Sequence, residues 1–134
     1  MDLIAENQFS LQKIAEILDD AYIEVDASNE GRLQVDMAAV RIGVIYDEGT
    51  KLLAFVSIFQ LKPGSALTRL ELVNNLNNDS RVVRSSFKQD ENVLWCDQQI
   101  SIKGGVTSRW LVFSLKQFAE ICLAVRWQMK EHIA

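Results

Sequence analysis

The residue types that most often carry catalysis or bind metal are scarce in this 134-residue sequence. It contains one histidine, His132, and two cysteines, Cys96 and Cys122, which do not have the spacing of a zinc site. His132 lies near the end of the sequence, where a general base or a metal ligand would have little support. The Gly104-Gly105 pair also lacks the spacing of a phosphate-binding loop. We therefore expect no catalytic residue, no metal and no cofactor, and hence no enzyme.

Positive charge and long apolar runs are also lacking. The chain has 14 Lys and Arg against 18 Asp and Glu, a formal charge of −4, and no basic cluster to neutralise phosphates, so we expect no nucleic-acid partner. No apolar run approaches the roughly 18 residues of a membrane span, and the first residues lack the pattern of a secretion signal. We expect a cytoplasmic protein, in which Cys96 and Cys122 are two buried thiols in preference to a disulfide.

Apolar residues, in contrast, are plentiful. They make up 49% of the sequence, enough for the core of one domain. We expect residues 1–134 to form a single domain whose first eight residues are frayed. Ser10 is placed to cap a helix over residues 11–21, in which apolar residues recur at helical spacing.

Strand-like sequence lies on both sides of a central helix. Strands are expected over 22–26, 32–46, 52–61, 81–88 and 93–102, with a bulge or bend near 37–39. The third strand is apolar on both faces, which predicts a central strand covered on both sides. The expected order is α-β-β-β-α-β-β-α. This order predicts an α+β domain with one antiparallel-dominated sheet and helices packed on it.

The central helix is marked by asparagine. Thr68 and Glu71 have the spacing of a capping box, with Ser65 as a competing cap. Four asparagines crowd the last turn, and asparagine is a poor interior helix residue that readily adopts the left-handed conformation. We therefore expect the helix to end at Asn77 or Asn78.

The last helix carries two apolar stripes and is expected to run from a cap at Thr107 or Ser108 to about Ile133. The first stripe has the a/d spacing of a coiled coil and consists of Leu111, Leu115, Phe118, Cys122, Val125 and Met129. The second lies roughly 140° round the helix and consists of Trp110, Phe113, Ile121, Ala124 and Trp127. One stripe can pack on the sheet. The second needs other cover, which is intramolecular core, a homodimer contact or a foreign protein, and its five residues are our candidate protein-interaction residues.

The central segment also resembles a known family. The string from Leu72 to Asn77, followed by Ser80-Arg81-Val82, is similar to the N-x-x-N helix and the following basic strand of the YbjN family, bacterial proteins described as sensory transduction regulators. The resemblance extends over residues 9–127 and includes Gly104–Thr107. It implies a fold like that of type III secretion chaperones, which are commonly dimeric, bind extended segments of partner proteins and catalyse nothing.

Together these observations predict a protein-binding module, chaperone-like or regulatory, that acts as a homodimer on an unidentified protein partner. The alternative is a small-molecule-binding domain or an enzyme of unknown reaction. A closed pocket with convergent polar groups would favour that alternative.

Overall fold

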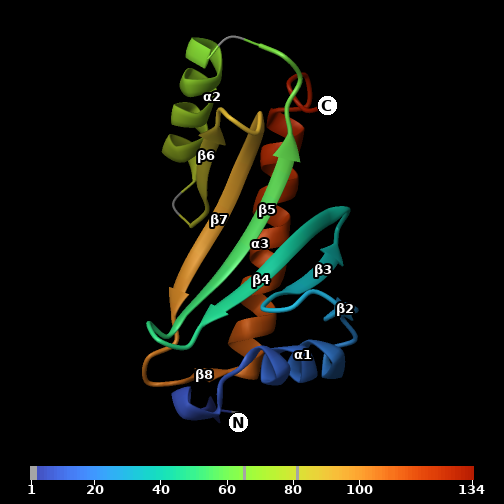
Figure 1. Cartoon of the computed structure of the whole chain (residues 1–134), viewed down its shortest axis with the longest axis vertical. Coiled ribbons are helices and arrows are strands. Elements are labelled where there is room, and N and C mark those ends of the chain that lie inside the picture. Colours follow the sequence, from blue (N-terminus) through green and yellow to red (C-terminus); the bar gives the residue numbers. More distant parts are fainter. Residues whose placement is uncertain (1–2, 65, 81) are drawn as a thin grey trace.

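The computed structural model describes residues 3–64, 66–80 and 82–134, and it has an α+β fold. Within these residues, three α-helices accompany the sheet: α1 (Leu11–Asp20), α2 (Ala66–Asp79) and α3 (Ser108–Gln128). The main sheet has six strands, all paired antiparallel in the order β2-β3-β4-β5-β7-β6. Its strands are β2 (Val25–Asp26), β3 (Leu33–Met37), β4 (Val40–Asp47), β5 (Leu52–Gln60), β6 (Arg84–Lys88) and β7 (Val93–Ser101). Helix α3 crosses one face of this sheet (Figure 1), and the expected α+β fold with an antiparallel sheet is confirmed.

The N-terminal segment is structured, which corrects the expectation of fraying for residues 3–8. Strand β1 (Leu3–Ile4) pairs with β8 (Val106–Thr107) as a second, two-stranded sheet, and a 3-10 turn (Glu6–Gln8) follows. Ile4 is buried in the core. The pairing needs glycine at position 105, because φ is +91° and a Cβ there would lie 2.6 Å from the Ile4 carbonyl oxygen. Residues 1 and 2 lie outside the described residues.

The first helix begins as expected and is followed by a shorter strand. The Lys13 backbone N–H donates to the Ser10 side chain at 3.0 Å, so Ser10 is the N-cap. At the other end Tyr22 has φ +61°, and the Ile23 N–H returns to the Leu18 carbonyl. This left-handed residue ends the helix in a tight turn. The strand expected over 22–26 is therefore reduced to β2.

The second expected strand is in fact a hairpin. Residues 32–46 do not bulge in the middle; Met37 pairs with Val40 across a two-residue turn between β3 and β4. Both turn residues, Ala38 and Ala39, have positive φ, at 52° and 63°, as the turn type that matches strand twist requires. Arg126 of α3 donates to the Ala39 carbonyl oxygen at 2.8 Å and holds the turn against the helix.

The core lies between α3 and the covered face of the sheet. The first stripe of α3 is buried along its whole length, and Phe118 lies 5.7 Å from Phe55 of β5 between ring centroids. The Trp110 N–H donates to Thr107 Oγ1 at 3.0 Å, so Thr107 caps α3. The helix ends at Gln128, earlier than expected, and is followed by turns up to the bridge between Ile133 and Leu61.

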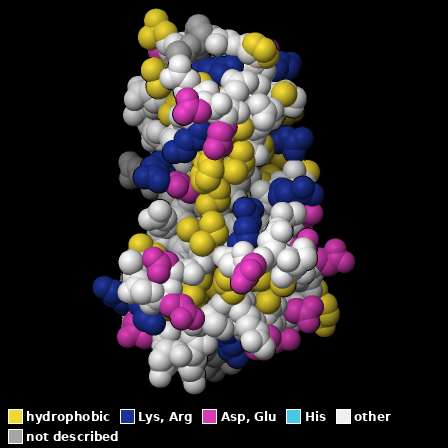
Figure 2. All heavy atoms as spheres, in the orientation of Figure 1, with side chains coloured by type: hydrophobic (Ala, Val, Ile, Leu, Met, Phe, Trp, Pro, Cys, Tyr) yellow, Lys and Arg dark blue, Asp and Glu magenta, His cyan; other side chains and the backbone are white. Residues whose placement is uncertain are grey.

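No helix of the described residues lies on the opposite face of the sheet, so the expectation that β5 is covered on both sides is wrong. Phe55 and its covered-face neighbours are buried, but Ile58 of β5 is 47% exposed and Ile45 of β4 is 39% exposed. Figure 2 shows apolar side chains gathered at the middle of this face. Strand β5 is therefore central in the sheet but covered on one side.

Helix α2 lies beside the edge strand β6. It begins at Ala66, so the capping box at Thr68 and Glu71 is not its start, and the competing cap Ser65 lies outside the described residues. It ends at Asp79, slightly later than expected. The side-chain amide of Asn77 donates to the Ser85 carbonyl oxygen at 2.9 Å and accepts the Ser85 N–H at 2.8 Å. These two bonds occupy the outer edge of β6, which would otherwise present unpaired backbone groups.

A buried arginine fixes the start of α2. Arg69 donates to the Asn92 side-chain oxygen and to the Lys62 carbonyl oxygen, and its guanidinium lies 5.0 Å from the centroid of the Phe87 ring. Through these contacts the helix is joined to the ends of β5 and β6.

Candidate functional site

The second stripe of α3 is largely exposed to solvent. Phe113 is 63% exposed, Trp127 71% and Trp110 36%; Ala124 is exposed as well, whereas Ile121 is half-buried and packs on the core. Among the described residues, no apolar packing buries these aromatic rings, so intramolecular core does not account for them. Cover by a second copy and cover by a foreign protein remain.

The stripe is divided into two apolar groups. At its C-terminal half, Leu123, Ala124 and Trp127 line a shallow groove of about 550 Å³, rimmed by Glu120, Arg126 and Lys130. The Lys130 ammonium lies 4.1 Å from the centroid of the Trp127 ring. A cation at this distance is attracted to the ring face and restricts the aromatic side chain. This end of α3 therefore presents a compact apolar surface with a charged rim.

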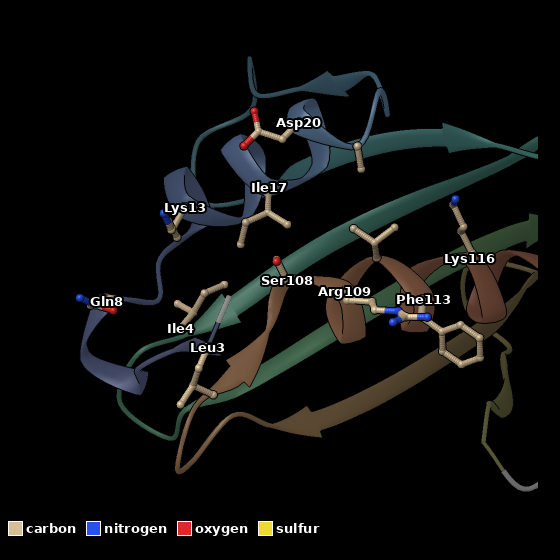
Figure 3. Close-up of a pocket in the computed structure, with 12 residues that line it drawn as sticks. Leu3, Ile4, Gln8, Lys13, Ile17, Asp20, Ser108, Arg109, Phe113 and Lys116 are labelled. Carbon is tan, nitrogen blue, oxygen red and sulfur yellow. The ribbon is translucent and has the colours of Figure 1, made fainter. Parts of the chain in front are cut away.

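The N-terminal half of α3 forms a larger groove with α1, which we call the α1–α3 groove. It has a volume of about 800 Å³. Figure 3 shows Ile17 of α1 and Leu3 and Ile4 of β1 beside the start of α3, where Arg109, Phe113 and Lys116 lie. The complete lining is Leu3, Ile4, Gln8, Lys13, Ile17, Asp20, Ala21, Ser108, Arg109, Val112, Phe113 and Lys116. Of the five predicted residues, only Phe113 lines this groove.

Two surfaces were missed by sequence reasoning. The α1–α3 groove depends on two helices that are distant in sequence, and the open sheet face depends on the absence of a covering helix. A signal for the groove was present, because Arg109 and Lys116 are seven residues apart and share one side of a helix with Phe113. No comparable signal predicts which face of an apolar strand is left open.

The side chains with the most reactive chemistry are buried or remote from these grooves. Cys96 and Cys122 are free and fully buried. The hydrogen bond with Cys96 and burial raise the pKa of the Cys122 thiol, so it stays protonated and is a poor nucleophile. Burial raises the pKa of Tyr46. His132 lies in the C-terminal turn. Its backbone carbonyl oxygen accepts a hydrogen bond from the Lys62 N–H at 2.7 Å, which joins this turn to the end of β5.

Within residues 3–64, 66–80 and 82–134, no group of three or more His, Cys, Asp and Glu side chains could hold a metal ion. None of the helices in the same ranges is sufficiently long and apolar to cross a membrane.

Comparison with known proteins gives a family and a fold. The family model described as "YbjN: Putative bacterial sensory transduction regulator" matches residues 10–131. No curated protein matches the chain. The crystal structure of YbjN, "a putative transcription regulator from E. coli", is similar with a TM-score of 0.82 and 18% identity, over 94% of this chain and 96% of that one. The HopA1–SchA chaperone–effector complex contains a chain similar with a TM-score of 0.64 and 9% identity, over 84% of this chain and 89% of that one. At these identities the two structures show a shared fold.

Proposed function

The chain belongs to the YbjN family, and from this and the exposed stripe of α3 we propose that it is a non-enzymatic protein-binding module. It is chaperone-like or regulatory, and it acts in the cytoplasm as a homodimer on a protein partner. A structure of similar fold comes from a chaperone–effector complex, which supports a protein partner here. The free thiols of Cys96 and Cys122 suit a reducing compartment.

The exposure of the second stripe of α3 is the observation that carries this proposal. Single exposed apolar residues are common on protein surfaces. Here, however, aromatic side chains recur along a helix of 21 residues, about 31 Å long. Tryptophan and other large aromatic side chains are frequent anchors at protein interfaces. Their recurrence on one helix face favours a protein partner over an isolated surface irregularity.

The two halves of the stripe suit different partners. The groove of Leu123, Ala124 and Trp127 has almost entirely apolar walls, as the cores of homodimer interfaces have. The small side chain of Ala124 would let a second helix approach closely. We therefore assign the C-terminal half to the homodimer, and the N-terminal half, which carries Phe113 and more charge, to the foreign partner.

Sedimentation over a range of concentrations tests the homodimer. We expect the protein, whose chain mass is 15.2 kDa, to sediment as a dimer at about 100 µM and to dissociate on dilution towards about 1 µM. Trp127→Ser should shift the equilibrium to monomer. Leu67→Ser, which removes an exposed apolar side chain of α2, is the matched control and should leave the dimer intact.

The partner is tested by affinity purification from the native host with the unmutated chain, Phe113→Ser and Leu67→Ser. We expect one protein to be recovered with the unmutated chain and with Leu67→Ser, and to be lost with Phe113→Ser. A monomer at every concentration, together with no specific protein in the purification, would refute the proposed function. A flat thermal-shift screen of small molecules would dispose of the alternative, a small-molecule-binding domain.

A further inference from the structure

The α1–α3 groove has a charge opposite to that of the whole chain. Its lining contains three cationic side chains, Lys13, Arg109 and Lys116, and one carboxylate, Asp20. The chain as a whole has a formal charge of −4. Lys13 also lies 3.9 Å from Glu16, but an exposed pair at that separation holds its partners weakly. The groove is therefore a local cationic site on an acidic protein.

The floor of the same groove is apolar. Ile4 and Ile17 are almost fully buried at its base, and Val112 and Phe113 form the α3 side. On α3 the order Arg109, Phe113, Lys116 places a cationic side chain about one helical turn to either side of the ring (Figure 3). A ligand in this groove meets apolar surface at the base and positive charge at the rim.

We propose that the α1–α3 groove binds an acidic amphipathic segment of the partner protein. Apolar side chains of that segment would lie on the floor of Ile4 and Ile17 and against Phe113 on the α3 side, and its carboxylates beside Lys13, Arg109 and Lys116. This inference rests on the proposed protein-binding function and adds the chemistry of the partner. A second copy presenting the same groove would bring like charges together, which disfavours self-association at this site.

Peptide binding measured by fluorescence anisotropy tests the inference. The probe is a labelled peptide of about 16 residues, some 24 Å long as a helix, with leucines on one side and glutamates on the other. One companion peptide has lysine in place of each glutamate, and a second has serine in place of each leucine. We expect the acidic, leucine-bearing peptide to bind at least about tenfold more tightly than either companion, and more weakly as salt screens the charges.

Charge reversal in the protein sharpens the test. The triple variant Lys13→Glu, Arg109→Glu, Lys116→Glu should bind the lysine peptide in preference to the glutamate peptide. Two of these positions lie in the first turns of α1 and α3, where glutamate favours the helix, so the variant should fold. Lys62→Glu is the control, because it reverses an exposed charge just after β5, a strand that ends far from α1 (Figure 1).

Equal binding of the acidic and basic peptides, lost in Phe113→Ser, would overturn the proposed partner chemistry and leave protein binding intact. Tight binding of the serine peptide would overturn the role of the apolar floor. Failure of all three peptides to bind would also overturn the inference. The protein-binding function would still be judged separately by sedimentation and affinity purification.

Discussion

Asn77 of α2 gives the sharpest test of how this fold is held together. Its amide makes two hydrogen bonds to Ser85 of the edge strand β6, as donor at 2.9 Å and as acceptor at 2.8 Å. Asn77→Ala removes both bonds, and each is worth about 1 kcal/mol net. Alanine also favours the helix by roughly 0.6 kcal/mol relative to asparagine. We expect the free energy of unfolding to fall by about 1 to 1.5 kcal/mol.

Asn78 supplies the matched control one residue further on. Its side chain is exposed and makes no hydrogen bond within the described part of the chain. Asn78→Ala should therefore show the gain in helix propensity alone. The difference between the two variants isolates the bonds to Ser85 and should be about 2 kcal/mol, measured by urea denaturation with an unchanged m value. Equal unfolding free energies for the two variants would refute the reasoning.

Hydrogen exchange provides an independent measurement at the same site. The Ser85 N–H is protected by Asn77 and points away from β7, so its exchange should accelerate in Asn77→Ala and remain slow in Asn78→Ala. Asn77→Asp keeps the acceptor but loses the donor to the Ser85 carbonyl. It should protect the amide while still lowering the free energy of unfolding. An unchanged exchange rate of the Ser85 N–H in Asn77→Ala would show that the Asn77 side chain does not protect the edge of β6.

Three further predictions concern a turn, the core and acid stability. Gly104→Ala should lower the free energy of unfolding by about 1 kcal/mol, because alanine is strained at positive φ. Gly105→Ala should lower it distinctly more, because the new Cβ would also clash with the backbone of β1. Equal melting temperatures of the two variants would contradict this. Phe118→Ala should lower the free energy of unfolding by about 3 to 5 kcal/mol, whereas Phe113→Ala, on the exposed side of the same helix, should change it by less than about 0.5 kcal/mol. Hydrogen bonds from a threonine hydroxyl and a backbone N–H in the following turn hold the pKa of Asp47 below its ordinary value of 3.8. These hydrogen bonds to the Asp47 carboxylate stabilise the folded protein fully above pH 3.8, and their contribution is lost as the pH falls through the lowered pKa of Asp47. The difference between the urea midpoints at pH 7 and pH 3 should therefore be smaller for Asp47→Asn than for the unmutated protein.

Much of the local structure follows from short-range signals. Ser10 and Thr107 cap helices because their hydroxyls lie where a helix N-terminus leaves N–H groups unpaired, and both caps are present. The a/d stripe of α3 is buried as its spacing predicts. The resemblance to the YbjN family, carried by the asparagine-rich segment, is confirmed over residues 10–131.

The errors arise where a long-range contact overrides a local preference. Ala38 and Ala39 do not resemble a two-residue hairpin turn, since alanine has no preference for positive φ. A contact with Arg126, distant in sequence, supports the turn. In the same way, Leu3 and Ile4 are too short a segment for their sequence alone to predict a strand. They form a strand because Gly105 lets another segment approach their backbone.

By itself, then, the sequence determined the α+β class, the caps of α1 and α3, the family and the presence of two apolar stripes on the last helix, because each depends on residues close together in the chain. The tertiary structure decided which stripe stays exposed, which face of β5 is left open and that Lys13 lines one groove with Arg109 and Lys116. Those outcomes depend on how α1 and α3 pack against the sheet and on each other. Periodicity shows that a surface is apolar, and only packing shows whether anything covers it.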